Sequence, residues 1–253
     1  MKRAIIIQAR MTSTRLPGKV LADLEGRPML ARQIERLRLC READQIVVAT
    51  TVNASDDPVV ALASESGLRS YRGSENDVLS RYVEAARECQ ADVIVRITSD
   101  CPLIDPGVTD RVISALTAGP ERCDYACNIL ERTYPRGLDV EALTVEALER
   151  CHREAASLED REHVTSYIRR ARPGVFVCRS ITDSADNSDL RWTVDTPSDL
   201  ELVRRIYREL DLVHRQLTYD QILTFVRSRP DLAQFNLENK TWDPNDGSSD
   251  VRN

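Results

Sequence analysis

Strand-like runs that alternate with stretches of helical periodicity constrain the fold of this chain more than any other feature. The runs lie at 5–7, 46–50, 69–72 and 93–97, and all but the third are apolar nearly throughout. Apolar runs of this length are typical of strands buried on both faces, and intervening helices favour parallel pairing. We therefore predict an α/β fold, a three-layer sandwich with a mainly parallel mixed sheet.

The pattern loosens in the second half of the chain, where the expected elements are shorter. Strands are expected near 124–128, 175–178 and 190–194, helices at 145–155 and 158–170, and capped helices that begin at Thr196 and Thr218. Residues 138–143 alternate apolar and polar side chains, which indicates an edge or half-buried strand. The length fits a single domain over 1–235, followed by a polar tail at 236–253.

Composition excludes several classes of protein. A formal charge of −6 and a pI near 5.3 argue against a nucleic-acid binder, which usually carries a basic face. No apolar stretch reaches the length of a membrane span, and the first residues do not resemble a signal peptide. Seven cysteines at irregular spacings do not predict a disulfide framework. We therefore expect a cytoplasmic protein with no membrane partner.

The segment after the first predicted strand carries hydroxyls, a flexible glycine and three cationic side chains without any helical or alternating period. Main-chain N–H groups, hydroxyls and fixed cations are the groups that a triphosphate requires. Gly18 allows the backbone to approach a ligand closely. A solvated basic loop is the alternative interpretation. The candidate nucleotide-binding residues are Gln8, Ala9, Arg10, Thr12, Ser13, Arg15 and Lys19.

Two carboxylates follow predicted strands and could hold a metal ion. Asp100, with Ser99 before it, comes after the strand at 93–97, where ligands of open α/β sheets usually bind. Asp195 comes after 190–194, and Thr196 already supplies the helix cap that Asp195 could otherwise provide. Mg²⁺ commonly takes one or two protein carboxylates and completes its shell with water and phosphate. The alternative is that each aspartate only caps a helix or turn.

These segments together resemble a known superfamily of enzymes. Three segments are similar to those of the CMP-sialic-acid and CMP-Kdo synthetases. They are the first strand followed by Ala-Arg and Ser/Thr-Arg-Leu-Pro-Gly-Lys, Thr-Ser-Asp-Cys-Pro-Leu at 98–103 and Thr-Val-Asp-Thr-Pro-Ser-Asp-Leu at 193–200. The branch with the strongest resemblance is that of spore coat polysaccharide biosynthesis protein F. It implies a nucleotide-diphospho-sugar transferase fold of the GT-A-like kind, with Mg²⁺ between Asp100 and Asp195.

The resemblance also implies roles for further residues. Gly73, Ser74 and Asp77 would line the nucleotide-base side of the pocket, although this segment also reads as a capped helix start. The acceptor side would include Arg136, Asp139, Glu141 and His163. For Glu141 the alternative is a solvated edge strand, and for His163 a packed helix residue.

The implied activity is transfer of CMP from CTP to an acidic sugar, a nonulosonic or Kdo-like acid, or to a small phosphonate, with release of pyrophosphate. Arg10, Arg15, Lys19 and Asp100 are the expected catalytic residues, and Mg²⁺ is the expected cofactor. A homodimer formed through about 125–175 is expected by the same analogy. Two alternatives stay open: a GT-A-type glycosyltransferase, although the chain has no Asp-x-Asp, and a nucleotide-binding protein without catalysis.

Overall fold

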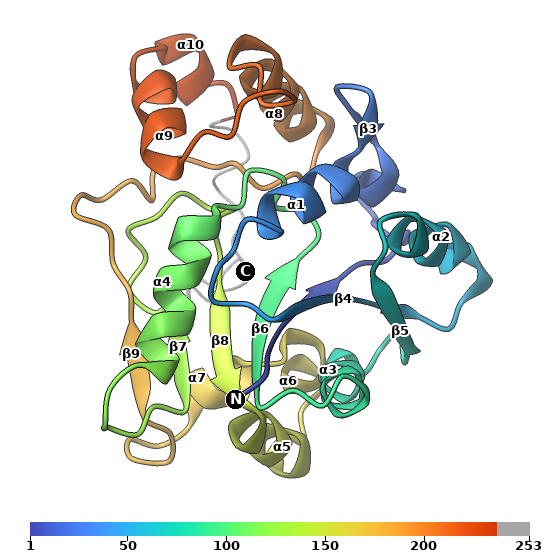
Figure 1. Cartoon of the computed structure of the whole chain (residues 1–253), viewed down its shortest axis with the longest axis vertical. Helices are drawn as coiled ribbons and strands as arrows, with labels where there is room; N and C mark the ends of the chain where they lie inside the picture. The colour runs from blue at the N-terminus through green and yellow to red at the C-terminus, as the bar shows by residue number, and fades with distance from the viewer. Residues whose placement is uncertain (237–253) are drawn as a thin grey trace, which may run out of the picture.

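The computed structural model describes residues 1–236 and contains one large sheet between two layers of helices (Figure 1). The strand order is β5-β4-β1-β6-β8-β7-β9. These strands are β1 Arg3–Gln8, β4 Gln45–Thr51, β5 Arg69–Gly73, β6 Val93–Thr98, β7 Tyr125–Cys127, β8 Glu141–Thr144 and β9 Cys178–Ser180. β1 pairs in parallel with β4 and β6, and β8 runs antiparallel to β6 and β7. The predicted mainly parallel mixed sheet is confirmed.

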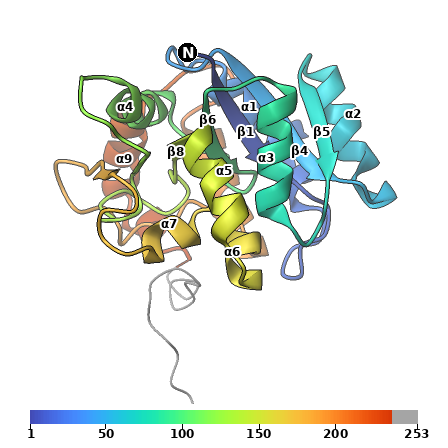
Figure 2. The same cartoon turned by 90° about the horizontal axis from the view of Figure 1, so that it is seen from below.

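The two faces of the sheet bury different sets of side chains, as the alternation of a strand requires. Ile5 and Ile7 point to the side covered by α1, α2 and α4, whereas Ala4 and Ile6 point to the side covered by α3 and α5. Figure 2 shows α3 and α5 side by side on their face of the sheet. The helices are α1 Met29–Leu37, α2 Asp57–Glu65, α3 Val78–Glu88, α4 Pro106–Thr117 and α5 Val145–Glu154.

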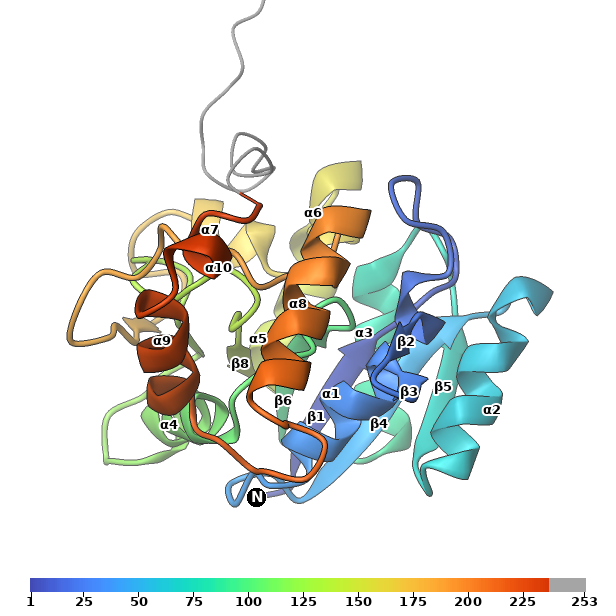
Figure 3. The same ribbon diagram turned by 90° about the horizontal axis from the view of Figure 1, so that it is seen from above.

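The remaining helices are shorter or lie outside these two layers. They are α6 Leu158–His163, α7 Ser166–Arg170, α8 Pro197–Glu209, α9 Tyr219–Arg227 and α10 Pro230–Ala233, and a short hairpin joins β2 Asp23–Leu24 to β3 Arg27–Pro28. Figure 1 shows α8, α9 and α10 grouped at the top of the molecule, and in Figure 3, seen from above, they lie toward the viewer. They bury a third apolar cluster around Trp192, Tyr207 and Tyr219. Within residues 1–236, no helix is both long and apolar enough to cross a bilayer.

Both predicted capping boxes are confirmed. The Thr196 hydroxyl accepts from the Asp199 amide at the start of α8, and Thr218 does the same for Gln221 at the start of α9. A capping box satisfies the amides that the first turn of a helix leaves without partners. These short-range patterns therefore set the beginnings of both helices.

Two predicted strands differ from the structure. The segment 138–143 is predicted to be an edge or half-buried strand, but β8 lies inside the sheet between β6 and β7. Glu141 is only 2% exposed, because Arg96 and two hydroxyls satisfy its carboxylate. Residues 190–194 form one isolated bridge and no strand. Their backbone amides donate hydrogen bonds to two separate segments: the Trp192 amide donates to the Arg136 carbonyl, and the Val194 amide donates to the Asp100 carbonyl.

Two further predicted elements have different bounds in the structure. The predicted strand at 175–178 begins only at Cys178. The predicted helix at 158–170 breaks into α6 and α7 at Val164, whose φ of 58° is incompatible with a right-handed helix. Of the predicted tail at 236–253, the structure describes only Asn236, which is buried, so the rest of that prediction lies outside the described residues.

Candidate active site

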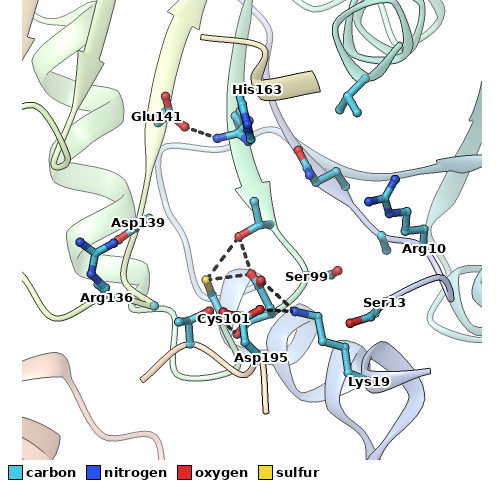
Figure 4. Close-up of a pocket in the computed structure, with 18 of the residues that line it drawn as sticks. Arg10, Ser13, Lys19, Ser99, Cys101, Arg136, Asp139, Glu141, His163 and Asp195 are labelled. Atoms are coloured by element: carbon cyan, nitrogen blue, oxygen red, sulfur yellow. Dashed lines mark hydrogen bonds and ion pairs between the residues drawn. The ribbon is translucent and has the colours of Figure 1, made fainter. Parts of the chain in front are cut away.

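A pocket of about 850 Å³ opens at the carboxyl ends of β1 and β6. The loop after β1 forms one wall, and residues from 129–141 with those of α6 and α7 form the opposite wall. In Figure 4, Arg136 and Asp139 lie across the cavity from Arg10 and Ser13. The structure brings together in its lining the predicted residues Gln8, Ala9, Arg10, Thr12, Ser13, Arg15, Lys19, Ser99, Asp100, Arg136, Asp139, Glu141, His163 and Asp195.

The loop after β1 is held by its own backbone and by one buried acid. The Gly18 amide donates to the Met11 carbonyl at 3.0 Å, and Gly18 adopts a φ of 69°, which closes the loop before Lys19. The Met11 amide donates to buried Asp56 at 2.7 Å. Arg10 makes no ion pair or hydrogen bond with any residue of 1–236. The loop thus presents a cation to the cavity from an ordered backbone.

Lys19 lies between the two predicted metal ligands. Its Nζ is 3.1 Å from Asp100 Oδ2 and 2.8 Å from Asp195 Oδ1, and it also donates to the Val194 carbonyl at 2.9 Å. Burial alone would raise the pKa of Asp100, but the Lys19 ammonium and a hydrogen bond from Thr98 hold that pKa at about 2. Burial would lower the pKa of Lys19, yet the two carboxylates raise it. Lys19 and Asp100 are therefore both charged at neutral pH.

Asp195 is fixed from several directions. Arg15 lies 3.0 Å from its Oδ1, and Arg191 donates to its Oδ2. Its amide donates at 3.0 Å to Asp199, which is completely buried. Asn236 donates its side-chain amide to Asp199 at 2.7 Å and to the Arg191 carbonyl at 3.1 Å. This network sets the direction in which the Asp195 carboxylate faces the pocket.

The donor set of the acid pair fits a magnesium ion that is shared with phosphate. Within residues 1–236 no cluster of three or more histidine, cysteine, aspartate or glutamate side chains is arranged to hold a metal. Two carboxylates, however, already converge on one cation, the Lys19 ammonium. Mg²⁺ in nucleotide sites is usually held by one or two carboxylates, with phosphates and water as its other ligands. Asp100 and Asp195 would hold it here.

The opposite wall is built around a buried glutamate and a tight backbone contact. Glu141 accepts from Arg96, from the Tyr125 hydroxyl at 2.6 Å and from Thr165. Burial would raise the pKa of Glu141, but the Arg96 guanidinium lowers it. Gly137 has a φ of 103°, and a Cβ there would lie 2.5 Å from the Thr193 amide nitrogen. Only glycine therefore lets this wall meet the segment that carries Asp195.

Asp139 and His163 line the same wall in different ways. Both Asp139 oxygens accept from Arg132, at 2.6 and 2.9 Å, in a two-bond ion pair. His163 is partly exposed at the end of α6. The position of Asp139 is therefore fixed by a neighbour, as the position of Glu141 is by Arg96.

Gly73, Ser74 and Asp77 are not part of this pocket. Asp77 caps α3 by accepting from the Ser80 amide at 2.8 Å and pairs with Arg161, while the Ser74 hydroxyl accepts from the Asp77 amide. Gly73 is paired within the sheet as the last residue of β5. The capped helix start is thus what the structure shows, because the side chains that would face a base are used in the turn.

Sequence reasoning missed several arginines that line the pocket. They are Arg81, Arg96, Arg132, Arg169 and Arg191. Among the described residues the lining carries nine arginines and lysines against five aspartates and glutamates, in a chain whose formal charge is −6. A cleft lined by one sign of charge concentrates ligands of the opposite sign. The excess of positive charge therefore favours an anionic ligand. Of the missed arginines, Arg96 had one signal in the sequence, because it is a charged residue inside the apolar run at 93–97.

Comparisons with known proteins point to one family. The sequence profile of the cytidylyltransferase family matches residues 4–222. Spore coat polysaccharide biosynthesis protein SpsF of Bacillus subtilis is 33% identical over 90% of this chain and 95% of its own length. A 3-deoxy-manno-octulosonate cytidylyltransferase of Anaeromyxobacter dehalogenans is 35% identical over 56% of this chain and 58% of its own length.

One solved structure matches along nearly the whole fold. A cytidylyltransferase from Leptospira borgpetersenii superposes with a TM-score of 0.87 at 32% identity, over 92% of this chain and 97% of that one. The family profile covers all seven strands of the sheet and both carboxylates of the acid pair. This chain belongs to the cytidylyltransferase family.

Proposed function

We propose that this enzyme transfers CMP from CTP to a small acidic acceptor in a Mg²⁺-dependent reaction that releases pyrophosphate. The observation that carries the proposal is the pocket itself, in which a cationic loop, an acid pair and a second basic wall share one cavity of about 850 Å³. The Kdo-specific relative suggests an acceptor of the sugar-acid class, and the excess of arginine supports an anionic one.

In this proposal the residues of the loop bind the triphosphate. Arg10, Arg15 and Lys19 would contact the β- and γ-phosphates and stabilise the charge that develops on the departing pyrophosphate. An acceptor oxygen attacks the α-phosphorus in line, so that one P–O bond forms while the bond to pyrophosphate breaks. Mg²⁺, when bound, would neutralise phosphate charge beside Asp100 and Asp195.

No protein nucleophile is needed, and Glu141 is not available as a general base. Its carboxylate is ionised, buried and satisfied by three donors. A phosphonate oxygen on the acceptor is already ionised at neutral pH and attacks without a base, whereas a hydroxyl oxygen of a sugar acid gives up its proton to solvent as the new P–O bond forms. Arg136 and His163, on the wall opposite the loop, are the residues that we assign to acceptor contacts. Catalysis then rests on positioning and charge neutralisation.

The test measures pyrophosphate release from CTP, UTP, GTP and ATP, each with Mg²⁺ and with EDTA, against sialic, legionaminic, pseudaminic and Kdo acids and small phosphonates. We expect release only with CTP, Mg²⁺ and one acidic acceptor class. Calorimetric titration of the same nucleotides reports binding where no acceptor turns over. Equal binding of all four nucleotides, or turnover in EDTA, would contradict the proposal.

A homodimer is also part of the proposal. Leu158 begins α6 with 88% of its surface exposed, within the region at about 125–175 expected to form the interface. A single exposed leucine is ordinary on a protein surface, so the proposal rests on the region expected to form the interface, and Leu158 serves as the position that probes it. Light scattering of the wild type and of Leu158→Arg tests it: we expect a dimer for the first and a monomer for the second.

A further inference from the structure

We propose that Lys19 keeps a divalent cation out of the acid pair until a triphosphate draws its ammonium away, so that metal and nucleotide enter the site together. The inference rests on the proposed function and adds an order of binding to it. It assigns to Lys19 a positioning role toward Asp100 and Asp195, in addition to its contact with phosphate.

The geometry leaves no space for two cations. Lys19 Nζ lies 3.1 Å from Asp100 and 2.8 Å from Asp195, so it occupies the point on which both carboxylates converge. Mg²⁺ binds carboxylate oxygen at about 2.0–2.1 Å. An ion held by both acids would therefore lie within roughly 3–4 Å of the ammonium, where like charges repel strongly. The metal site forms only when Lys19 moves.

The carboxylates around the pair already have cationic partners without a metal. Lys19, Arg15 and Arg191 lie within ion-pair distance of Asp195, Lys19 also pairs with Asp100, and Arg191 also pairs with Asp199. A divalent ion alone would add two positive charges beside these cations. A triphosphate brings several negative charges, which offset those of the ion.

The position of Lys19 gives the ammonium a second place to go. Its side chain is 12% exposed and lines the pocket beside Arg10 and Ser13 of the loop. Phosphate oxygens held by this loop would replace the carboxylates as partners of the ammonium. Linkage then requires that the metal and the triphosphate each strengthen the binding of the other by the same factor.

The test measures Mn²⁺ binding to the nucleotide-free protein by electron paramagnetic resonance of the unbound ion. We expect weak binding by the wild type and binding roughly 10- to 100-fold tighter by Lys19→Met and Lys19→Gln, because removal of the ammonium opens the acid pair. Lys2→Met, at the opposite end of β1, is the control and should resemble the wild type. Addition of Asp195→Asn to Lys19→Met should abolish the gain.

A measurement on the unaltered protein covers the case in which both variants misfold. Mg²⁺ alone should leave the melting temperature of the wild type unchanged, whereas CTP with Mg²⁺ should raise it more than CTP with EDTA. Equal Mn²⁺ affinity of the wild type and both variants, or a stabilisation by Mg²⁺ alone as large as that with CTP, overturns the inference. Absence of pyrophosphate release with every acceptor contradicts the proposed function instead, since metal binding without nucleotide does not depend on turnover.

Discussion

Replacement of Arg96 by methionine tests whether the Glu141 carboxylate belongs to the framework of the site or to its chemistry. Arg96 is a pocket-lining residue of β6, and Glu141 on the neighbouring strand is 2% exposed. The variant keeps the unbranched apolar stem of the side chain but leaves a buried carboxylate without the guanidinium that is hydrogen-bonded to it. Removal of one partner of a buried ion pair typically costs about 3–5 kcal/mol. For a protein of this size that loss corresponds to a fall in melting temperature of roughly 6–20 °C.

The second substitution in the same experiment separates charge from packing. Glu141→Gln removes the unpaired charge but still accepts from the Tyr125 and Thr165 hydroxyls. We therefore expect Arg96→Met with Glu141→Gln to recover at least half of the lost free energy of unfolding, measured by urea denaturation. Arg27→Met is the control, because its ion pair with Glu35 is exposed and should contribute less than about 1 kcal/mol.

The pH dependence gives an independent check. Arg96 lowers the pKa of Glu141 in the folded protein, so the stabilisation is present above the unfolded pKa and is lost as the pH falls through the folded one. The double variant should lack this loss on the acid side. A cost below 1 kcal/mol for Arg96→Met, or a double variant whose loss equals the sum of the single losses, would refute the reasoning.

Three further substitutions probe other parts of the site. Arg10→Ala should lower kcat/KM by roughly 100- to 1,000-fold, whereas Arg41→Ala, outside the pocket, should leave it unchanged; equal rates would remove Arg10 from the phosphate loop. The pKa of Asp100 is about 2 in the folded protein, so the ionised carboxylate should stabilise the fold above the ordinary pKa near 3.8, and this contribution should be lost as the pH falls from 3.8 to about 2. Asp100→Asn should therefore weaken the pH dependence of stability in this range, measured as acid unfolding by circular dichroism. Gly137→Ala should destabilise the protein by more than about 2 kcal/mol in thermal denaturation, because a clash with the Thr193 backbone adds to the strain of a positive φ. Gly119 also has a positive φ but open space around it, so Gly119→Ala is the control and should show only the strain.

The sheet and the acid pair could be predicted because their signals are local. Three of the four strands predicted in the first half are nearly continuous apolar runs, and parallel strands bring their carboxyl ends to one edge. Asp100 could therefore be assigned to the pocket from its place after β6. Asp195 reaches the same point although its segment is not a strand, because the Val194 amide binds the Asp100 carbonyl at 2.8 Å.

The rest depends on partners that are distant in sequence. Glu141 looks like a residue of a solvated strand until Arg96, 45 residues earlier, is placed beside it. Arg191 carries no motif, and its role is visible only once Asp195 and Asp199 surround it. The break at Val164 could not be predicted either, because no local signal marks it: Val164 is buried in the core, and the Thr165 hydroxyl after it donates to the distant Glu141 carboxylate.

Asn236 sets a limit on how far the protein can be shortened. The last helix of the described chain ends at Ala233, and a truncation designed from secondary structure would stop there. The side-chain amide of Asn236, however, supports Asp199 and the Arg191 backbone, and these two residues hold Asp195. A unit that retains a complete acid pair therefore extends at least to residue 236, beyond the last helix of the described residues.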